Sequence, residues 1–217
     1  MTRTQQIVGV CIAGVVCTAL CAWLLSSGRV HPPFEIGKEE KSPLFGSLSI
    51  ARAVEIAENE KSSEYLILEY IAHEGTPQKI SGWTIESTAQ KINVRIPEGN
   101  TLFRQGVVPT LSPISLFPGE RALLSPQSSP VGASFQSNIC SPALEQFQNF
   151  YPAFTRTDRT ITEGFYNDCV ERENTNPQFF FPEWRVFLNS QDSLFSSEHD
   201  HLILKDEKGL IIAEYSY

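Results

Sequence analysis

Short runs of alternating or wholly apolar residues recur along most of the chain, separated by turn residues at intervals of roughly ten residues. Residues 91–96 are the clearest case, because apolar and polar side chains alternate and Pro97 follows. Residues 48–57 also contain helix-favouring Ala, Arg and Glu, but their alternation favours a strand. Strands are predicted at residues 48–57, 65–68, 80–85, 91–96, 101–104, 115–117, 120–124, 183–188, 201–204 and 210–217. This pattern predicts an all-β domain, a β-sandwich rather than a set of βαβ units.

Residues 64–87 predict a β-hairpin, two paired strands joined by a turn at 74–77, where Gly75 and Pro77 supply turn-forming backbone conformations. The second of these strands contains Trp83. A Trp in an early strand of an all-β domain usually anchors the core, because it buries a large apolar area. We assign Trp83 to the core, together with Trp184 of strand 183–188.

Residues 7–25 contain no charged side chain and are long enough to span a bilayer as a helix. The stretch is longer than the usual apolar region of a cleaved signal peptide, and its Cys residues lie in no lipobox. A retained membrane anchor at residues 1–25 is therefore the expectation, with a cleaved signal peptide as the alternative. Residues 26–46 predict a polar linker, and residues 47–217 a single domain outside the cytoplasm.

Residues 125–182 differ from the rest because prolines, Ser, Asn and Gln interrupt every regular pattern. They predict a long irregular insertion, with one or two helical turns at 141–150. Cys140 and Cys169 lie in this insertion and are the cysteines outside the apolar segment. In an oxidising compartment we expect a disulfide between them, worth roughly 3 kcal/mol. The alternative is a thiol pair serving a metal or redox site, although their spacing matches no C-x-x-C motif.

The composition and net charge of the chain favour some functions over others. The chain has 217 residues and a formal net charge of −8, which disfavours binding to nucleic-acid phosphates. Aromatic residues make up 11% and charged residues 19%, as in a globular domain. No nucleophile elbow, phosphate-binding loop, dinucleotide-binding fingerprint or H-E-x-x-H motif occurs, so the prediction is a protein that is not an enzyme and needs no cofactor.

The segment 198–201 is the one cluster with ligand chemistry. His199 and His201 share one face of a strand and are weak candidates for holding a metal ion, while Asp200 points the other way. Two ligands are too few without a third. The favoured interpretation is therefore a polar segment that leads from a loop into a strand.

Aromatic residues concentrate between residues 147 and 181 of the insertion. Part of them is expected to form a small satellite core around the Cys pair, and the remainder to form a surface that binds a partner. Aromatic rings also stack on sugars and bases, so a glycan groove is an alternative. The candidate binding surface consists of Phe147, Tyr151, Phe154, Arg156, Arg159, Phe165 and Tyr166.

Four pieces of sequence resemble the lamin tail domain, an immunoglobulin-like β-sandwich. They are residues 64–69, the Ile-Ser-Gly-Trp-Thr-Ile segment 80–85, the Leu-Phe-Pro-Gly-Glu segment 116–120, and the closing segment 200–215. The whole chain is also similar to membrane-anchored lamin-tail-like proteins of small-genome bacteria of the Patescibacteria type, in which a Cys-containing insertion precedes a Glu-Trp-Arg-Val strand, as at 183–186. The resemblance implies an extracytoplasmic interaction module and supplies no catalytic residues.

These observations lead to one main hypothesis and three alternatives. The main hypothesis is a single-pass membrane protein whose external domain binds or tethers a protein or cell-surface polymer without catalysis. The alternatives are an accessory domain that presents nucleic acid to a surface nuclease, a weak metal-dependent hydrolase using His199 and His201, and an envelope scaffold that associates through sheet edges.

Overall fold

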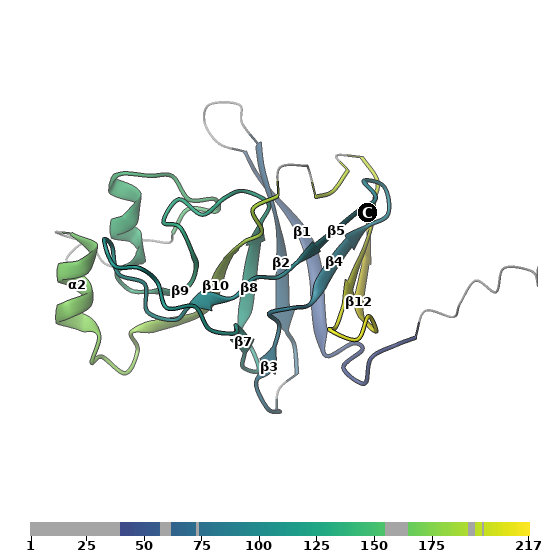
Figure 1. The fold of residues 1–217 in the computed structure, drawn as a ribbon, viewed down its shortest axis with the longest axis horizontal. Coiled ribbons are helices and arrows are strands. Elements are labelled where there is room, and N and C mark those ends of the chain that lie inside the picture. Colours follow the sequence, from purple (N-terminus) through teal and green to yellow (C-terminus); the bar gives the residue numbers. More distant parts are fainter. Residues whose placement is uncertain (1–39, 57–61, 73, 155–164, 191–193, 197) are drawn as a thin grey trace, which may run out of the picture. The chain divides into compact units, whose positions relative to one another are not determined.

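The computed structural model describes residues 40–56, 62–72, 74–154, 165–190, 194–196 and 198–217 (Figure 1). The expectation of a mostly β fold is confirmed in these residues, where the helices are the short 3-10 helix η1 (Ser141–Gln146) and the α-helix α2 (Tyr166–Glu173). The strands are β1 (Leu48–Ile56), β2 (Ser62–Tyr70), β3 (Gln78–Lys79), β4 (Thr84–Ser87), β5 (Ile92–Arg95), β6 (Gly99–Asn100), β7 (Ser115–Leu116), β8 (Arg121–Ser125), β9 (Ser134–Asn138), β10 (Phe180–Phe187), β11 (His201–Lys205) and β12 (Ile211–Ser216). The predicted anchor lies outside the described residues, and no helix within them is long and apolar enough to cross a membrane.

Two sheets share one hydrophobic core, an arrangement compatible with a β-sandwich. The first sheet has the strand order β1-β2-β8-β10-β9-β6, and the second has the order β12-β11-β4-β5. Leu66 and Leu124 of the first sheet and Ile85, Leu202 and Ile212 of the second belong to this first core, and each is at most 3% exposed. Trp83 and Trp184, which the sequence assigns to the core, are each 4% exposed and belong to it.

The predicted pairing within residues 64–87 is wrong. β2 pairs with β1 and β8 in one sheet, whereas β4 pairs with β11 and β5 in the other. Residues 80–83 form a turn instead of a strand, and the Trp83 amide donates a hydrogen bond to the Ile80 carbonyl at 3.1 Å. Gly82 has φ +92°, a conformation that favours glycine. The chain thus crosses from one sheet to the other, because both apolar faces must be buried in the same core.

Residues 125–182 are more regular than predicted. β9 lies within them and pairs antiparallel with β10, and the helical turns expected at 141–150 are present as η1. The α-helix α2 is not predicted by the sequence pattern. The disulfide between Cys140 and Cys169 is confirmed, with Cα atoms 5.7 Å apart. Figure 1 shows the segment that contains α2 beside the β9 and β10 side of the first sheet.

A second hydrophobic core surrounds the disulfide, as the sequence predicts for part of the aromatic residues. Its members come from the loop before β7, from β9, from both helices and the residues next to η1, and from the segment before β10. They are Phe103, Phe135, Cys140, Ala143, Leu144, Phe150, Phe154, Tyr166, Cys169, Val170 and Phe179. Residues 101–104, predicted as a strand, belong to this irregular loop, and the Phe103 side chain is buried in the second core.

The predicted linker 26–46 ends earlier than expected. Residues 26–39 lie outside the described part, but residues 40–46 pack on the domain. Lys41 forms a parallel bridge with Ile211, and the Ser42 hydroxyl donates a hydrogen bond to the Asp206 carboxylate at 2.9 Å. Leu44 packs against the first core. The domain therefore includes these residues, because their backbone and side chains complete its edge at β12.

Candidate functional site

A groove with a volume of about 560 Å³ lies on the face of the first sheet that points away from the first core. Strands β2, β8 and β10 form its floor, and segments 152–154 and 181–182 form its wall. Its lining residues are Tyr65, Ile67, Glu69, Gly119, Arg121, Leu123, Pro152, Ala153, Phe154, Phe181, Pro182, Glu183 and Arg185.

The strand registers explain which side chains reach the groove. β8 pairs antiparallel with β2 and parallel with β10, so residues from three distant parts of the sequence become neighbours. Two rows of side chains cross the strands, Glu69–Arg121–Glu183 and Ile67–Leu123–Arg185. Side chains two residues apart on a strand share a face, and the intervening residues, such as Leu68 and Trp184, belong to the first core. Both rows therefore point into the groove.

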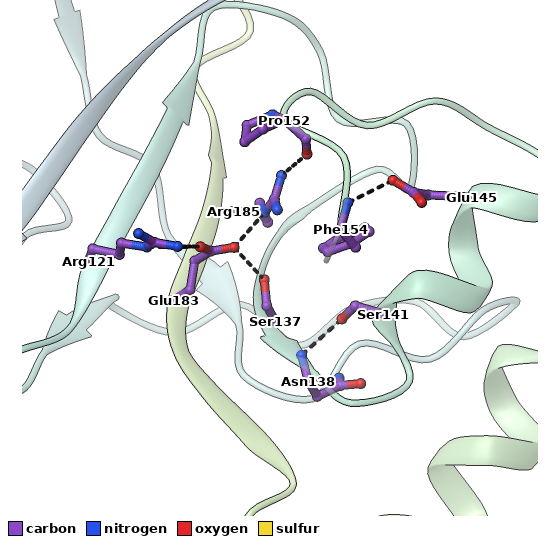
Figure 2. A network of polar contacts seen from close by, with 9 residues as sticks. All are labelled: Arg121, Ser137, Asn138, Ser141, Glu145, Pro152, Phe154, Glu183 and Arg185. Carbon is purple, nitrogen blue, oxygen red and sulfur yellow. Dashed lines mark hydrogen bonds and ion pairs between the residues drawn. The ribbon is translucent and has the colours of Figure 1, made fainter. Parts of the chain in front are cut away.

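Glu183 is the centre of a polar network under the wall (Figure 2). Its carboxylate accepts two hydrogen bonds from the Arg121 guanidinium, at 2.9 and 2.6 Å, and one from Nε of Arg185 at 2.9 Å. The Ser137 hydroxyl donates a further one at 3.5 Å. Paired and hydrogen-bonded in this way, the carboxylate is stabilised in a position that is 9% exposed.

Arg185 ties the wall of the groove to its floor. It donates a hydrogen bond to the Pro152 carbonyl, and its guanidinium carbon lies 4.4 Å from the centre of the Phe154 ring. The Phe154 amide in turn donates to the Glu145 carboxylate at 2.8 Å, as Figure 2 shows. Burial lowers the pKa of the Arg185 guanidinium from its ordinary value, and the negative charge of Glu183 opposes this effect. The groove is thus formed in advance by interactions within the chain.

Two charged side chains remain accessible in the groove. The side chain of Arg121 is 52% exposed, although its Nε and Nη2 atoms bind Glu183. Glu69, its neighbour on β2, is exposed as well. A donor and an acceptor therefore lie side by side above an apolar floor. Such a pocket, mostly apolar with a few oriented polar groups, is typical of ligand-binding sites.

Phe154 and Tyr166 do not lie on the predicted binding surface. They are 6% and 1% exposed and belong to the second core. The Tyr166 hydroxyl donates to the Phe103 carbonyl at 3.2 Å and accepts from the side-chain Nδ2 of Asn138 at 3.0 Å. Burial raises the pKa of Tyr166 to about 12. Because the hydroxyl has partners inside the core, the whole ring can be buried.

The remaining residues of the predicted surface separate into three groups. Phe147 and Phe165 are 71% and 61% exposed, and their rings stack with centroids 6.4 Å apart. Tyr151 is partly exposed. Arg156 and Arg159 lie outside the described residues. Among the described residues of the predicted set, only Phe154 lines the groove, where its buried ring supports Arg185.

His199 and His201 contact different groups. Nδ1 of His201 lies 2.7 Å from the Ser216 hydroxyl, and Nδ1 of His199 lies 3.3 Å from the Tyr217 carbonyl. In the described part of the chain, no three His, Cys, Asp or Glu side chains gather in a way that could hold a metal ion. The neighbouring Asp200 is 6% exposed and accepts hydrogen bonds from the Ser87 hydroxyl and three backbone amides. Asp200 thereby fixes the loop before β11.

Of the segments that carry the family resemblance, residues 64–69 supply Tyr65, Ile67 and Glu69 to the groove, and two others have structural roles. The Ser81 hydroxyl donates to the Pro97 carbonyl at 2.7 Å and accepts from the Ile114 amide at 2.8 Å. In the segment 116–120, the Gly119 amide donates to the Tyr70 carbonyl at 2.8 Å, and Gly119 has φ +83°. These residues connect loops to strands, and of them Gly119 also lines the groove.

Comparisons with known proteins assign the chain to no family. No protein-family model matches the chain, and a search of curated proteins found no match. The groove itself therefore carries the functional argument.

Sequence reasoning missed the groove residues Tyr65, Glu69, Arg121, Glu183 and Arg185. One signal was available, since Glu183 and Arg185 alternate with Trp184 and Val186 in a strand. Two opposite charges on the second face of a strand whose first face is apolar indicate an ion pair or a polar site. Their partner Arg121 is 62 positions away from Glu183, and no local pattern connects them.

Proposed function

We propose that this chain is a non-catalytic binding or tethering module whose ligand occupies the groove on β2, β8 and β10. The preformed groove is the observation that carries the proposal, because the wall is held by the Glu183–Arg185 network before any ligand arrives. A rigid site loses little conformational entropy when it binds, which favours affinity. The ligand is a protein or a cell-surface polymer.

The proposal includes a fold family and a location. The fold is an immunoglobulin-like sandwich of lamin-tail type, supported by two sheets with a common core and by the structural roles of Ser81 and Gly119. The domain is extracytoplasmic, anchored by the apolar segment 7–25. The buried disulfide supports that location, since disulfides persist in oxidising compartments.

Site-specific photo-crosslinking in the native cell tests the binding role. Ala153 is exposed and lines the groove, so a photoreactive phenylalanine derivative introduced there reaches whatever occupies it. Asn93 is the matched control, an exposed residue of β5 in the other sheet. We expect a discrete adduct from position 153 that position 93 does not give. The substitution Tyr65→Glu, which places a charge in the groove, is expected to abolish it.

Identical adducts from positions 153 and 93, or an adduct that survives Tyr65→Glu in a folded protein, contradict a role for the groove. If position 153 gives the expected specific adduct, mass spectrometry of that adduct shows whether the ligand is a polypeptide or a polysaccharide.

The location has a separate test. A membrane-impermeant reagent that modifies lysine is expected to label Lys91, which is exposed, in intact spheroplasts. A cytoplasmic protein in the same cells serves as the control and stays unlabelled. Labelling of Lys91 only after lysis would place the domain inside the cell.

A further inference from the structure

The chemical class of the ligand follows from how the groove is built, and this inference rests on the proposed function. The floor strands β2, β8 and β10 are interior strands, each paired on both sides within the first sheet. Their backbone groups are used in the sheet, so the groove cannot bind a peptide by adding it as a strand. The ligand has to be recognised by side chains.

The charges of the groove balance. Arg121 lies between Glu69 and Glu183 on the two neighbouring strands. Arg185 is two residues from Glu183 on β10, and these two side chains neutralise each other under the wall. The domain as a whole is acidic. A polyanion such as a nucleic acid would therefore find no net positive charge in the groove and no positive electrostatic potential around it. A polycation finds its carboxylate partners already paired with arginine, except for Glu69.

The two accessible polar groups form a donor–acceptor pair. Arg121 keeps its Nη1 atom outside the hydrogen bonds to Glu183, and Glu69 offers carboxylate oxygens beside it. Hydroxyl groups both donate and accept hydrogen bonds. A ligand with vicinal hydroxyls can therefore use Arg121 and Glu69 together, with one hydroxyl accepting from the guanidinium and the next donating to the carboxylate.

The rest of the groove is apolar and aromatic. Ile67 and Leu123 form the floor beside Glu69 and Arg121, and the partly exposed rings of Tyr65 and Phe181 stand at its margins. A sugar ring combines an apolar face of C–H groups with a rim of hydroxyls. It thus fits a surface where apolar side chains and a donor–acceptor pair lie next to each other.

We infer that the groove binds a neutral saccharide chain, whose hydroxyls are bound by Arg121 and Glu69 and whose C–H faces rest on Tyr65, Ile67 and Phe181.

The test measures binding of the full-length chain to an array of neutral oligosaccharides built from glucose, galactose, mannose and N-acetylglucosamine. Oligomers of alginate serve as the anionic probe and a proline-rich peptide as the polypeptide probe. We expect binding to at least one neutral oligosaccharide and none to alginate. Arg121→Ala and Glu69→Ala should each weaken that binding roughly tenfold, since each removes a hydrogen bond to a charged group.

Arg95→Ala and Glu98→Ala are the matched controls, because both residues are exposed and lie outside the groove. They should leave the affinity unchanged. Ala153→Arg is a second test that removes no interaction of the network, and it should abolish binding by filling the groove. The melting temperature of each variant shows whether it is folded.

Three results would overturn the saccharide assignment: no neutral oligosaccharide binds, the proline-rich peptide binds instead, or binding survives Ala153→Arg in a folded protein. A polypeptide adduct from position 153 in the crosslinking experiment also overturns it, while leaving the groove's binding role intact. A different result contradicts the proposed function itself: the photoreactive residue at position 153 gives no specific adduct in the native cell.

Discussion

At the scale of single residues, β10 contains buried charges. Glu183 and Arg185 alternate with Trp184 and Val186, so the strand has an apolar face in the first core and an ionic face under the groove wall. The side chains of Glu183 and Arg185 are only 12% and 5% exposed. A buried ion pair adds little stability by itself, but removing one member leaves the other charge without compensation.

Glu183→Leu is expected to lower the free energy of unfolding by about 3–5 kcal/mol, because Arg185 would remain buried without its carboxylate. Urea denaturation measures the loss. Glu207→Leu is the control, since Glu207 forms an ion pair with Lys79 in which both side chains are about half-exposed. It should cost less than about 1 kcal/mol. Equal effects of the two substitutions would show that the Glu183 network does not hold the groove wall.

Asp200 gives the fold a dependence on pH. Burial pushes its pKa up, but hydrogen bonds from Ser87 and from the Ala89, Ser196 and His201 amides outweigh burial, so its pKa lies below the ordinary 3.8. A carboxyl group with a lowered pKa stabilises the fold above its unfolded pKa, and this contribution disappears as the pH falls through the folded pKa.

Asp200→Asn is therefore expected to cost about 1–3 kcal/mol at neutral pH, because the amide nitrogen cannot accept the hydrogen bonds. The difference from the unsubstituted protein should shrink below about pH 4. Chemical denaturation at a series of pH values measures it. Glu98→Gln, at an exposed position, provides the reference. A difference that stays constant down to pH 2 would rule out ionised Asp200 as the cause.

At the scale of elements, β10 lies between two cores. Trp184 and Val186 pack in the first core, and Phe187 packs against the second, which covers the other face. Glu183, Trp184, Arg185 and Val186 are consequently all buried, although a strand at a solvent-facing sheet would bury only alternate residues. The insertion is thus an integral layer of the domain, connected to the sheet through β9 and the disulfide.

Replacing Cys140 and Cys169 together by Ala is expected to lower the free energy of unfolding by about 3 kcal/mol, since the disulfide closes a long loop in the unfolded chain. Denaturation with and without a reductant measures this. The reductant should destabilise the unsubstituted protein and leave the double variant unchanged. An unsubstituted protein whose stability is the same in both conditions would contradict a stabilising disulfide.

At the scale of the whole molecule, the two sheets depend on each other. Trp83 belongs to the core that both sheets share, and its backbone carbonyl accepts a hydrogen bond from Ile96 at 2.8 Å. Leu66 and Leu68 of β2 and Ile85 of β4 bury their side chains in this same core. The two sheets should therefore unfold together.

Trp83→Ala is expected to cost about 3–5 kcal/mol, the usual range for truncating a buried large side chain. Thermal and urea denaturation, followed by both circular dichroism and fluorescence of the remaining Trp residues, measure the loss and its cooperativity. Phe147→Ala is the matched control, because Phe147 is 71% exposed. It should change stability by less than about 1 kcal/mol. An unchanged melting temperature for Trp83→Ala would contradict its role in the shared core.

The sequence by itself determined most strands, the buried Trp residues and the Cys pair. Alternation along 91–96 is a local property of a strand with one buried face, and it predicts β5. The apolar run at 202–204 is equally local and predicts β11, a strand whose central residues are buried on both faces. The two cysteines outside the apolar segment left few choices for pairing. Turn-forming residues are also visible locally, and they mark the ends of most predicted strands close to where the structure ends them.

Only the tertiary structure decided which strands pair, which aromatic residues are buried, and where the groove lies. β2 and β4 are successive large strands with similar patterns, yet they belong to opposite sheets. Phe147 and Phe154 look alike in sequence, but only Phe154 meets the buried Arg185 guanidinium. The groove combines Glu69, Arg121 and Glu183 through strand registers. Such contacts depend on how distant strands align, and the local period of two residues contains no information about that alignment.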